Sequence, residues 1–198
     1  MHVASEARPR RSARRAPSPR ASAAVTVAVA AGLGVWIALG HAGSSPSSGH
    51  AGAARAIVGR PYVANVAGLS ALERSLRHAV FWVGAEAGTR YEVTMTKAGS
   101  VYVRYLSAGA SVGDSRPIFT TVGTYPVSNA YAVVRKSART KGSVVAHLTG
   151  AGLAVRDASS PTSVYVAYPG SQYLVEVYVP SPGDPMALVR NGALRTVP

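Results

Sequence analysis

Apolar and polar residues alternate through much of the second half of this chain. In YEVTMT (91–96) and VYVRYL (101–106) every second side chain is apolar or aromatic, the period of a strand with one buried face. The residues between them, 97–99, predict a three-residue hairpin loop with Gly99 in the left-handed conformation. A two-residue loop would mix the two faces. The predicted register pairs Met95 with Val101, Val93 with Val103, Tyr91 with Tyr105, and Glu92 with Arg104.

A second hairpin is predicted in SVYVAYPGSQYLVEVYVP (163–180), with its turn near 169–172. The sequence leaves two registers for this hairpin, which differ by a shift of two residues. Such a shift does not change the face of the sheet on which each side chain lies. The stretches VYVRYL and VYVAYP share the pattern V-Y-V-x-Y, which we interpret as a strand with inward valines. An internal duplication is not indicated, because the surrounding residues do not match.

Three short helices complete the prediction. Ser70 and Glu73 have the spacing of a capping box, which predicts a helix over 71–79 lying on the sheet. A second helix is predicted over 129–140, capped by Ser128, and a third from near Asp184 to Gly192. Further strands are predicted at VFWVG, where the sheet begins, and at PIFTTVGTYP, SVVAHL and GLAVR, with LRTVP as a tail. These elements predict an α+β domain with an antiparallel sheet.

The amino-terminal sixty residues have a different pattern. Residues 1–20 hold six arginines against one glutamate, and residues 21–40 carry no formal charge. Twenty helical residues span about 30 Å, the thickness of a bilayer core, and the flanking arginines favour a cytoplasmic amino terminus. We therefore predict a cytoplasmic tail (1–20), a transmembrane signal anchor (21–42), a Gly/Ser/Ala-rich linker (43–60) and an extracytoplasmic domain (61–198). The alternative is cleavage after Ala42, which would secrete the domain.

The net charge of +13 is concentrated in part at the amino terminus, and the chain has no cysteine. Disulfides and thiolate sites are therefore excluded. Nucleic acid is not a predicted partner, because no basic surface with interleaved aromatic residues is apparent.

Motifs for catalysis and cofactors are weak. GASVG (109–113) matches G-x-S-x-G, but Pro117 and a strand follow Ser111 where a nucleophile elbow requires a helix. His78 and His147 have no second ligand at metal-site spacing. GAGLAV lacks the third glycine of a dinucleotide fingerprint. We predict no catalytic residue, no metal site and no cofactor.

Two groups of residues are candidates for a site. Glu92, Tyr102 and Arg104 fall on one sheet face, where Glu92 and Glu176 would be the place for a paired-carboxylate site. A solvated sheet face explains these residues more simply. The second group lies at the end of the second helix and would attract anionic lipid or an acidic wall polymer, although such charge also suits the helix dipole. Its members are Arg135, Lys136, Arg139 and Lys141.

Several strings resemble a group of actinobacterial proteins of unknown function that have a basic amino terminus, one membrane segment and a small extracytoplasmic domain. They are VFWVGAEAGTRYEVTMTKAGSVYVRYL, TVGTYPVSNAY, GAGLAV and PTSVYVAYPGSQYLVEVYVP, and the resemblance covers about 72–197. It implies an actinobacterial cell envelope and adds no site residue.

The sequence thus predicts a single-pass membrane protein whose outward domain binds a ligand or scaffolds an envelope assembly without catalysis. An envelope hydrolase or transferase with an unrecognised site is one alternative, and a secreted soluble domain is another. Besides the bilayer itself, the expected partners are anionic lipid, a wall polymer or an unidentified protein.

Overall fold

The structure is a computed structural model, and it describes residues 58–198. The predicted tail, membrane segment (21–42) and most of the predicted linker lie outside the described residues. Within 58–198 no helix has the length and apolar character needed to cross a bilayer.

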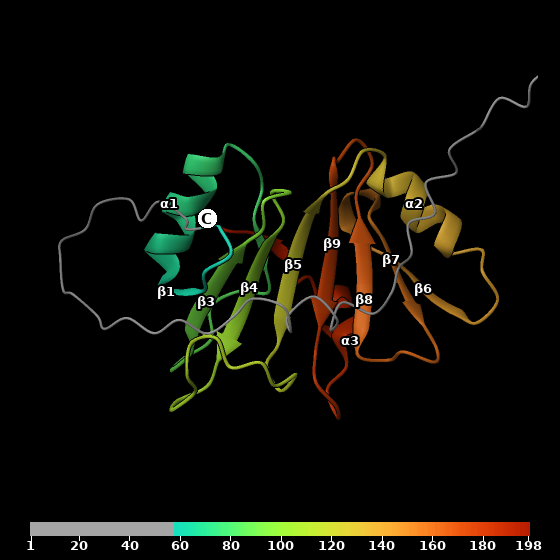
Figure 1. The fold of residues 1–198 in the computed structure, drawn as a ribbon. Coiled ribbons are helices and arrows are strands. Elements are labelled where there is room, and N and C mark those ends of the chain that lie inside the picture. Colours follow the sequence, from blue (N-terminus) through green and yellow to red (C-terminus); the bar gives the residue numbers. More distant parts are fainter. Residues whose placement is uncertain (1–57) are drawn as a thin grey trace, which may run out of the picture. The chain divides into compact units, whose positions relative to one another are not determined.

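Strands and short helices follow one another along the described chain (Figure 1). They are β1 (Tyr62–Ala64), α1 (Val66–Leu76), β2 (Phe81–Trp82), β3 (Arg90–Met95), β4 (Val101–Leu106), β5 (Thr121–Pro126), α2 (Ala130–Ser137), β6 (Ser143–His147), η2 (Thr149–Ala151), β7 (Leu153–Asp157), β8 (Ser163–Ala167), β9 (Tyr173–Tyr178), α3 (Pro185–Arg190) and β10 (Arg195–Thr196).

Eight of these strands form one antiparallel sheet in the order β1-β3-β4-β5-β9-β8-β7-β6, while β2 and β10 pair in a separate ribbon. The predicted α+β class with an antiparallel sheet is confirmed for the described domain. The register predicted for β3 and β4 is also confirmed, from Met95 opposite Val101 to Tyr91 opposite Tyr105. Its loop contains Gly99 at φ 81°, and the Thr96 N–H donates to the Ser100 carbonyl at 2.9 Å.

The strands run in chain order from each edge to the centre, with three strands on each side of the central antiparallel pair β5 and β9. The two V-Y-V-x-Y strands, β4 and β8, each lie beside that pair. Val103 on β4 pairs with Val122, and Val166 on β8 pairs with Val175. The two halves of the sheet, β1-β3-β4-β5 and β6-β7-β8-β9, can be matched so that Val103 corresponds to Val166 and Val122 to Val175. In that match the cross-strand pair Gly123–Glu176 lies at the centre of the sheet. The repeated pattern therefore marks equivalent places in one sheet.

One face of the sheet, which we call the valine face, carries the main core. It is covered by α1, by α3 and by the β2–β10 ribbon, as the members of one buried cluster show. Aromatic rings extend this cluster, with Tyr91 edge-on to both Trp82 and Tyr105. The buried residues include Val93, Val101, Val103, Val122, Val164, Val166, Val175 and Val177 from the sheet, and Leu69, Leu72, Met186, Val189, Phe81, Trp82 and Val197 from its cover.

The other face, which we call the polar face, is covered by two different segments. Helix α2 packs over β7, β8 and β9 through Ala130 and Val134, which contact a small cluster containing Leu153, Val155 and Leu174. The connection between β4 and β5 (residues 107–120) covers part of the rest. Between them lie the acidic and tyrosine side chains described below.

The start of the first helix differs from the prediction. Helix α1 begins at Val66, five residues before the predicted start, and Asn65 caps it by accepting the Gly68 N–H at 2.8 Å. The Ser70 hydroxyl instead donates to the Val66 carbonyl within the helix. The predicted capping box with Glu73 is therefore wrong, because the apolar stripe of the helix continues toward Asn65.

The ends of the sheet and of the chain also differ from the prediction. Residues 81–82 were expected to begin the main sheet, but both side chains are buried and the strand pairs with β10. The main sheet has β1 as its edge instead. The predicted carboxyl-terminal tail is likewise wrong, since Val197 is buried and its N–H donates to the Val80 carbonyl.

Candidate functional site

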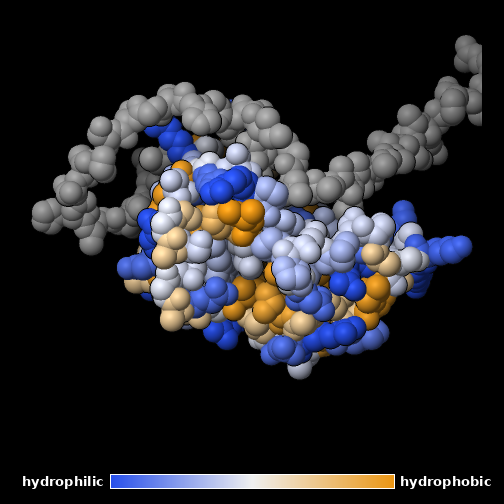
Figure 2. All heavy atoms as spheres, turned by 90° about the horizontal axis from the view of Figure 1, so that it is seen from below, coloured by the Kyte–Doolittle hydropathy of each residue, from blue (hydrophilic) through white to orange (hydrophobic). Residues whose placement is uncertain are grey.

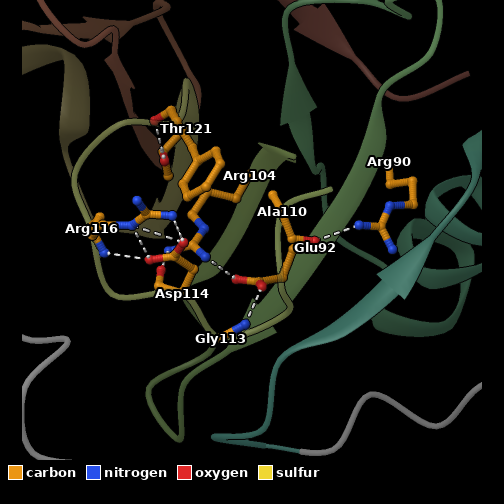
Figure 3. Close-up of polar contacts among 9 residues, drawn as sticks. Arg90, Glu92, Arg104, Ala110, Gly113, Asp114, Arg116 and Thr121 are labelled. Atoms are coloured by element: carbon orange, nitrogen blue, oxygen red, sulfur yellow. Dashed lines mark hydrogen bonds and ion pairs between the residues drawn. The ribbon is translucent and has the colours of Figure 1, made fainter. Parts of the chain in front are cut away.

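The first predicted cluster contains an ion pair between Glu92 on β3 and Arg104 on β4 (Figure 3). The hairpin register places the two residues directly opposite each other. Arg104 Nη2 lies 3.1 Å from Glu92 Oε1, and the residues are only 5% and 1% exposed. The prediction brought the right residues together, but the expected solvated face is wrong at this position.

The β4–β5 connection closes over this ion pair. The Gly113 N–H donates to Glu92 Oε2 at 2.6 Å, and the Arg104 guanidinium donates to the Asp114 carbonyl. The same guanidinium lies over the Phe119 ring, with its Cζ 4.9 Å from the ring centroid. Each partner of the ion pair thus also holds a main-chain group of the connection.

Two further side chains of the sheet hold the same connection. Arg90, at the start of β3, donates to the Ala110 carbonyl (Figure 3). Tyr178, at the end of β9, donates its hydroxyl proton to the Pro117 carbonyl at 2.7 Å. Because all four hydrogen bonds reach main-chain groups, the path of the connection depends on the sheet more than on its own side chains.

The electrostatics of this region favour a structural role. Burial raises the pKa of Glu92, and the Gly113 N–H and the Arg104 guanidinium partly offset that rise. A general acid or base must reach the proton it transfers, whereas this carboxylate is enclosed. Nearby, hydrogen bonds from Arg116 lower the pKa of Asp114 to about 2. This part of the described chain is therefore a loop fastened to the sheet through a buried ion pair.

Tyr102 borders a second cluster. It pairs with Gly123 across the sheet, and its ring lies edge-on to that of Tyr125 with centroids 5.7 Å apart. Burial raises the pKa of Tyr102, and its hydrogen bond with Tyr125 offsets part of that rise. Tyr102 thus lies on the same face of β4 as Arg104 and packs against Tyr125.

The centre of this second cluster is Glu176 on β9, which is 7% exposed. Its Oε2 accepts the Tyr125 hydroxyl at 2.6 Å, and its Oε1 accepts the hydroxyls of Ser163 at 2.8 Å and Tyr165 at 3.2 Å. No cation is among these donors. Burial together with the nearby Glu176 carboxyl raises the pKa of Tyr125 and of Tyr165. We call these four residues the Glu176 cluster.

Gly123 makes room for this cluster. A Cβ atom at this position would lie 2.7 Å from the Tyr125 hydroxyl and 2.9 Å from two of its ring carbons. The absence of a side chain thus lets the Tyr125 ring fold back over its own strand toward Glu176.

Glu92 and Glu176 do not form a paired-carboxylate site. Both lie on the polar face, but β4 and β5 separate their strands. Three strand spacings amount to about 14 Å, whereas the two carboxyls of glycosidases lie about 5 to 9.5 Å apart.

The remaining predicted positions are peripheral. Ser111 is exposed in a turn where its carbonyl accepts the Asp114 N–H, and no helix follows it. The His78 ring lies 5.5 Å from that of Tyr173, and His147 is exposed at the end of β6. Among residues 58–198 no three metal-binding side chains come together.

The four basic residues at the end of α2, which we call the basic patch, are all exposed. Arg135 and Lys136 belong to the last turn, while Arg139 and Lys141 follow the helix end at Ser137. No ion pair within the described part of the chain involves any of the four. The patch is thus available to an external anion.

Sequence reasoning missed the Glu176 cluster and the anchoring of the β4–β5 connection. The glycine inside the strand TVGTY was a usable signal, since glycine in a strand marks a close approach by another group. Comparison with protein-family models, with curated proteins and with solved structures finds no match to this chain.

Proposed function

We propose that residues 58–198 form a non-catalytic binding domain, held outside the cytoplasmic membrane by a segment at 21–42. Its ligand is a phosphate-rich anionic component of the envelope, either a lipid headgroup or an acidic wall polymer. The binding surface is the basic patch of Arg135, Lys136, Arg139 and Lys141.

One contrast carries this proposal. The buried carboxyls of Glu92 and Glu176 are occupied by internal partners, while the basic patch is exposed and has no acidic partner in the described chain. Four cations close in sequence and without an ion-pair partner in residues 58–198 favour attraction of an anionic surface, at about 1 kcal/mol per basic residue.

Stabilisation of α2 does not account for the whole patch. Cations favour the carboxyl end of a helix, but the effect falls off within the last turn. Arg135 and Lys136 meet that requirement, and Arg139 and Lys141 lie past the helix end.

The experiment compares the full chain in neutral detergent with a variant in which all four patch residues are replaced by Gln. The probes are fluorescent long-chain inorganic polyphosphate and, separately, phosphatidylglycerol vesicles, each at low and high salt. We expect binding that weakens with salt, and affinity on the order of a hundredfold or more lower in the variant at low salt.

A matched control distinguishes local charge from net charge. Arg74, Arg77, Lys97 and Arg190 are also exposed, so replacing these four by Gln removes the same charge elsewhere. The control should lose much less affinity than the patch variant. Equal losses would refute the basic patch as the binding surface.

A further inference from the structure

A second exposed surface lies on the β4–β5 connection. Large apolar side chains that remain exposed in the described chain include Val63, Val112 and Ile118, at 43%, 42% and 51%. Val112 and Ile118 lie on the connection itself. Val63 lies on β1 opposite Glu92, and so faces the side of the sheet that the connection covers.

Contacts of the connection with the sheet place Val112 near β1 and place Ile118 next to a residue that packs on β4. Glu92 accepts a hydrogen bond from the Gly113 N–H, and a Cβ atom at Gly113 would lie 3.6 Å from the side chain of Pro61, the residue before β1. This contact places Val112 beside the strand that carries Val63. Ile118 precedes the buried ring of Phe119, which packs against Arg104. Figure 2 views the end of the domain at which β4 and β5 are joined, and shows apolar areas bordered by hydrophilic ones.

The border of this region is cationic. Arg90 and Arg116 are exposed and bond to Ala110 and Asp114, which come two residues before and two residues after Val112 in the chain. The nearby acid, Asp114, forms an ion pair with Arg116 at 2.6 Å, so the net positive charge of this border comes from Arg90. Exposed aliphatic side chains bordered by arginines suit the headgroup region of an anionic bilayer. We call Val63, Val112, Ile118, Arg90 and Arg116 the loop surface.

We infer that the loop surface docks on the outer leaflet of the membrane in which residues 21–42 lie. This inference rests on the proposed function, because it requires the membrane anchor. The described chain begins along the β1 edge of the sheet, where the Gly59 N–H donates to the Met95 carbonyl at the end of β3 that leads into the β3–β4 hairpin. The preceding residues must therefore extend along the domain for the loop surface to reach the bilayer. The fifteen residues between 42 and 58 span at most about 54 Å even when fully extended, so the domain stays near the bilayer.

Docking of this kind depends on the anchor. Three partly exposed aliphatic side chains bind a bilayer weakly by themselves. A short connection raises the effective concentration of the surface to the order of millimolar, which makes weak contacts sufficient. Hydrogen bonds from the sheet fix the main chain of the connection, so Val112 and Ile118 are in place before the domain contacts the membrane. Docking therefore has to order few residues.

The absence of cysteine in the chain permits single-site labelling. The variants Val112→Cys and Ile118→Cys carry an environment-sensitive NBD label in the full chain. The control is Ser75→Cys, an exposed position on α1, which covers the opposite face of the sheet. Each protein is reconstituted into phosphatidylcholine vesicles with and without phosphatidylglycerol, and quenching is measured with nitroxide-labelled lipid and with aqueous iodide.

We expect severalfold stronger quenching by nitroxide lipid at 112 and 118 than at 75, with the opposite order for iodide. Phosphatidylglycerol should increase the difference. Equal quenching at all three positions in protein that an alkaline wash leaves on the vesicles would overturn the docking inference and leave the anchor intact. Protein lost from the vesicles in that wash would contradict the anchor, and with it both proposals.

Discussion

The two buried glutamates of the polar face are accommodated in different ways. Glu92 faces a guanidinium and a loop N–H, whereas Glu176 accepts hydrogen bonds from three neutral hydroxyls. The first arrangement fastens a loop to the sheet, and the second ties the central strands β5, β8 and β9 together. The difference shows that burial of an acid on a sheet does not by itself indicate a reactive site, because every oxygen here has an internal partner.

The same substitution at the two acids should have unequal effects, and this is the largest difference we expect. Glu92→Gln leaves Arg104 buried without its counter-charge, a loss that costs about 3–5 kcal/mol in buried ion pairs. Glu176→Gln leaves no cation without a counter-charge and disturbs hydrogen bonds only, so it should lower the free energy of unfolding by about 1–3 kcal/mol. Urea unfolding followed by tryptophan fluorescence measures both free energies of unfolding.

A double variant checks the cause of the larger effect. Glu92→Gln combined with Arg104→Met should cost clearly less than the sum of the single changes. Simple additivity would mean that the ion pair is not the source.

Within the Glu176 cluster, the donors should differ in importance. Tyr125→Phe removes the shortest hydrogen bond, at 2.6 Å, and should lower the free energy of unfolding by about 1.5–3 kcal/mol. Tyr165→Phe should cost less, because its bond is 3.2 Å long and Ser163 serves the same oxygen. A larger loss from Tyr165→Phe would be inconsistent with the described geometry.

Gly123→Ala should destabilise the domain by about 1–3 kcal/mol, as overpacking does, because the new Cβ meets the Tyr125 ring. Alanine is normally the better strand residue by about 0.5–1 kcal/mol. The sign should therefore reverse in a Tyr125→Ala background, where the ring is gone. Thermal unfolding of the four proteins tests this, and a loss that persists without the ring would argue against the proposed contact.

The cluster should also make the domain sensitive to alkali, as the smallest of these effects. Tyr125 and Tyr165 have raised pKa values in the folded state, whereas an unfolded tyrosine ionises near a pKa of about 10. The folded state then holds more protons above that pH, so stability falls as pH rises through and beyond about 10. Tyr125→Phe should flatten the decline in melting temperature, and an unchanged slope would count against the cluster as its cause.

The two regions also differ in how far the sequence could predict them. Strict alternation and Gly99 determine the β3–β4 register, so the pairing of Glu92 with Arg104 followed from local pattern alone. The bond from Tyr125 to Glu176 joins residues 51 apart in sequence, and depends on which strands become neighbours in the sheet. Alternation does not specify that order. The sequence also could not predict that the β4–β5 connection covers the ion pair. That contact uses main-chain groups of the connection, which carry no sequence signal.

The most direct test compares polyphosphate affinity and melting temperature in two variants of the full chain. One variant neutralises the basic patch of Arg135, Lys136, Arg139 and Lys141, and the other carries Glu92→Gln. We predict that the patch variant loses affinity and keeps its melting temperature, while Glu92→Gln melts earlier and, below its transition, binds polyphosphate as well as the unaltered chain. The opposite result would be a loss of affinity in folded Glu92→Gln together with unchanged binding in the patch variant. That result would contradict the account, in which the basic patch binds the ligand and the buried acids stabilise the fold.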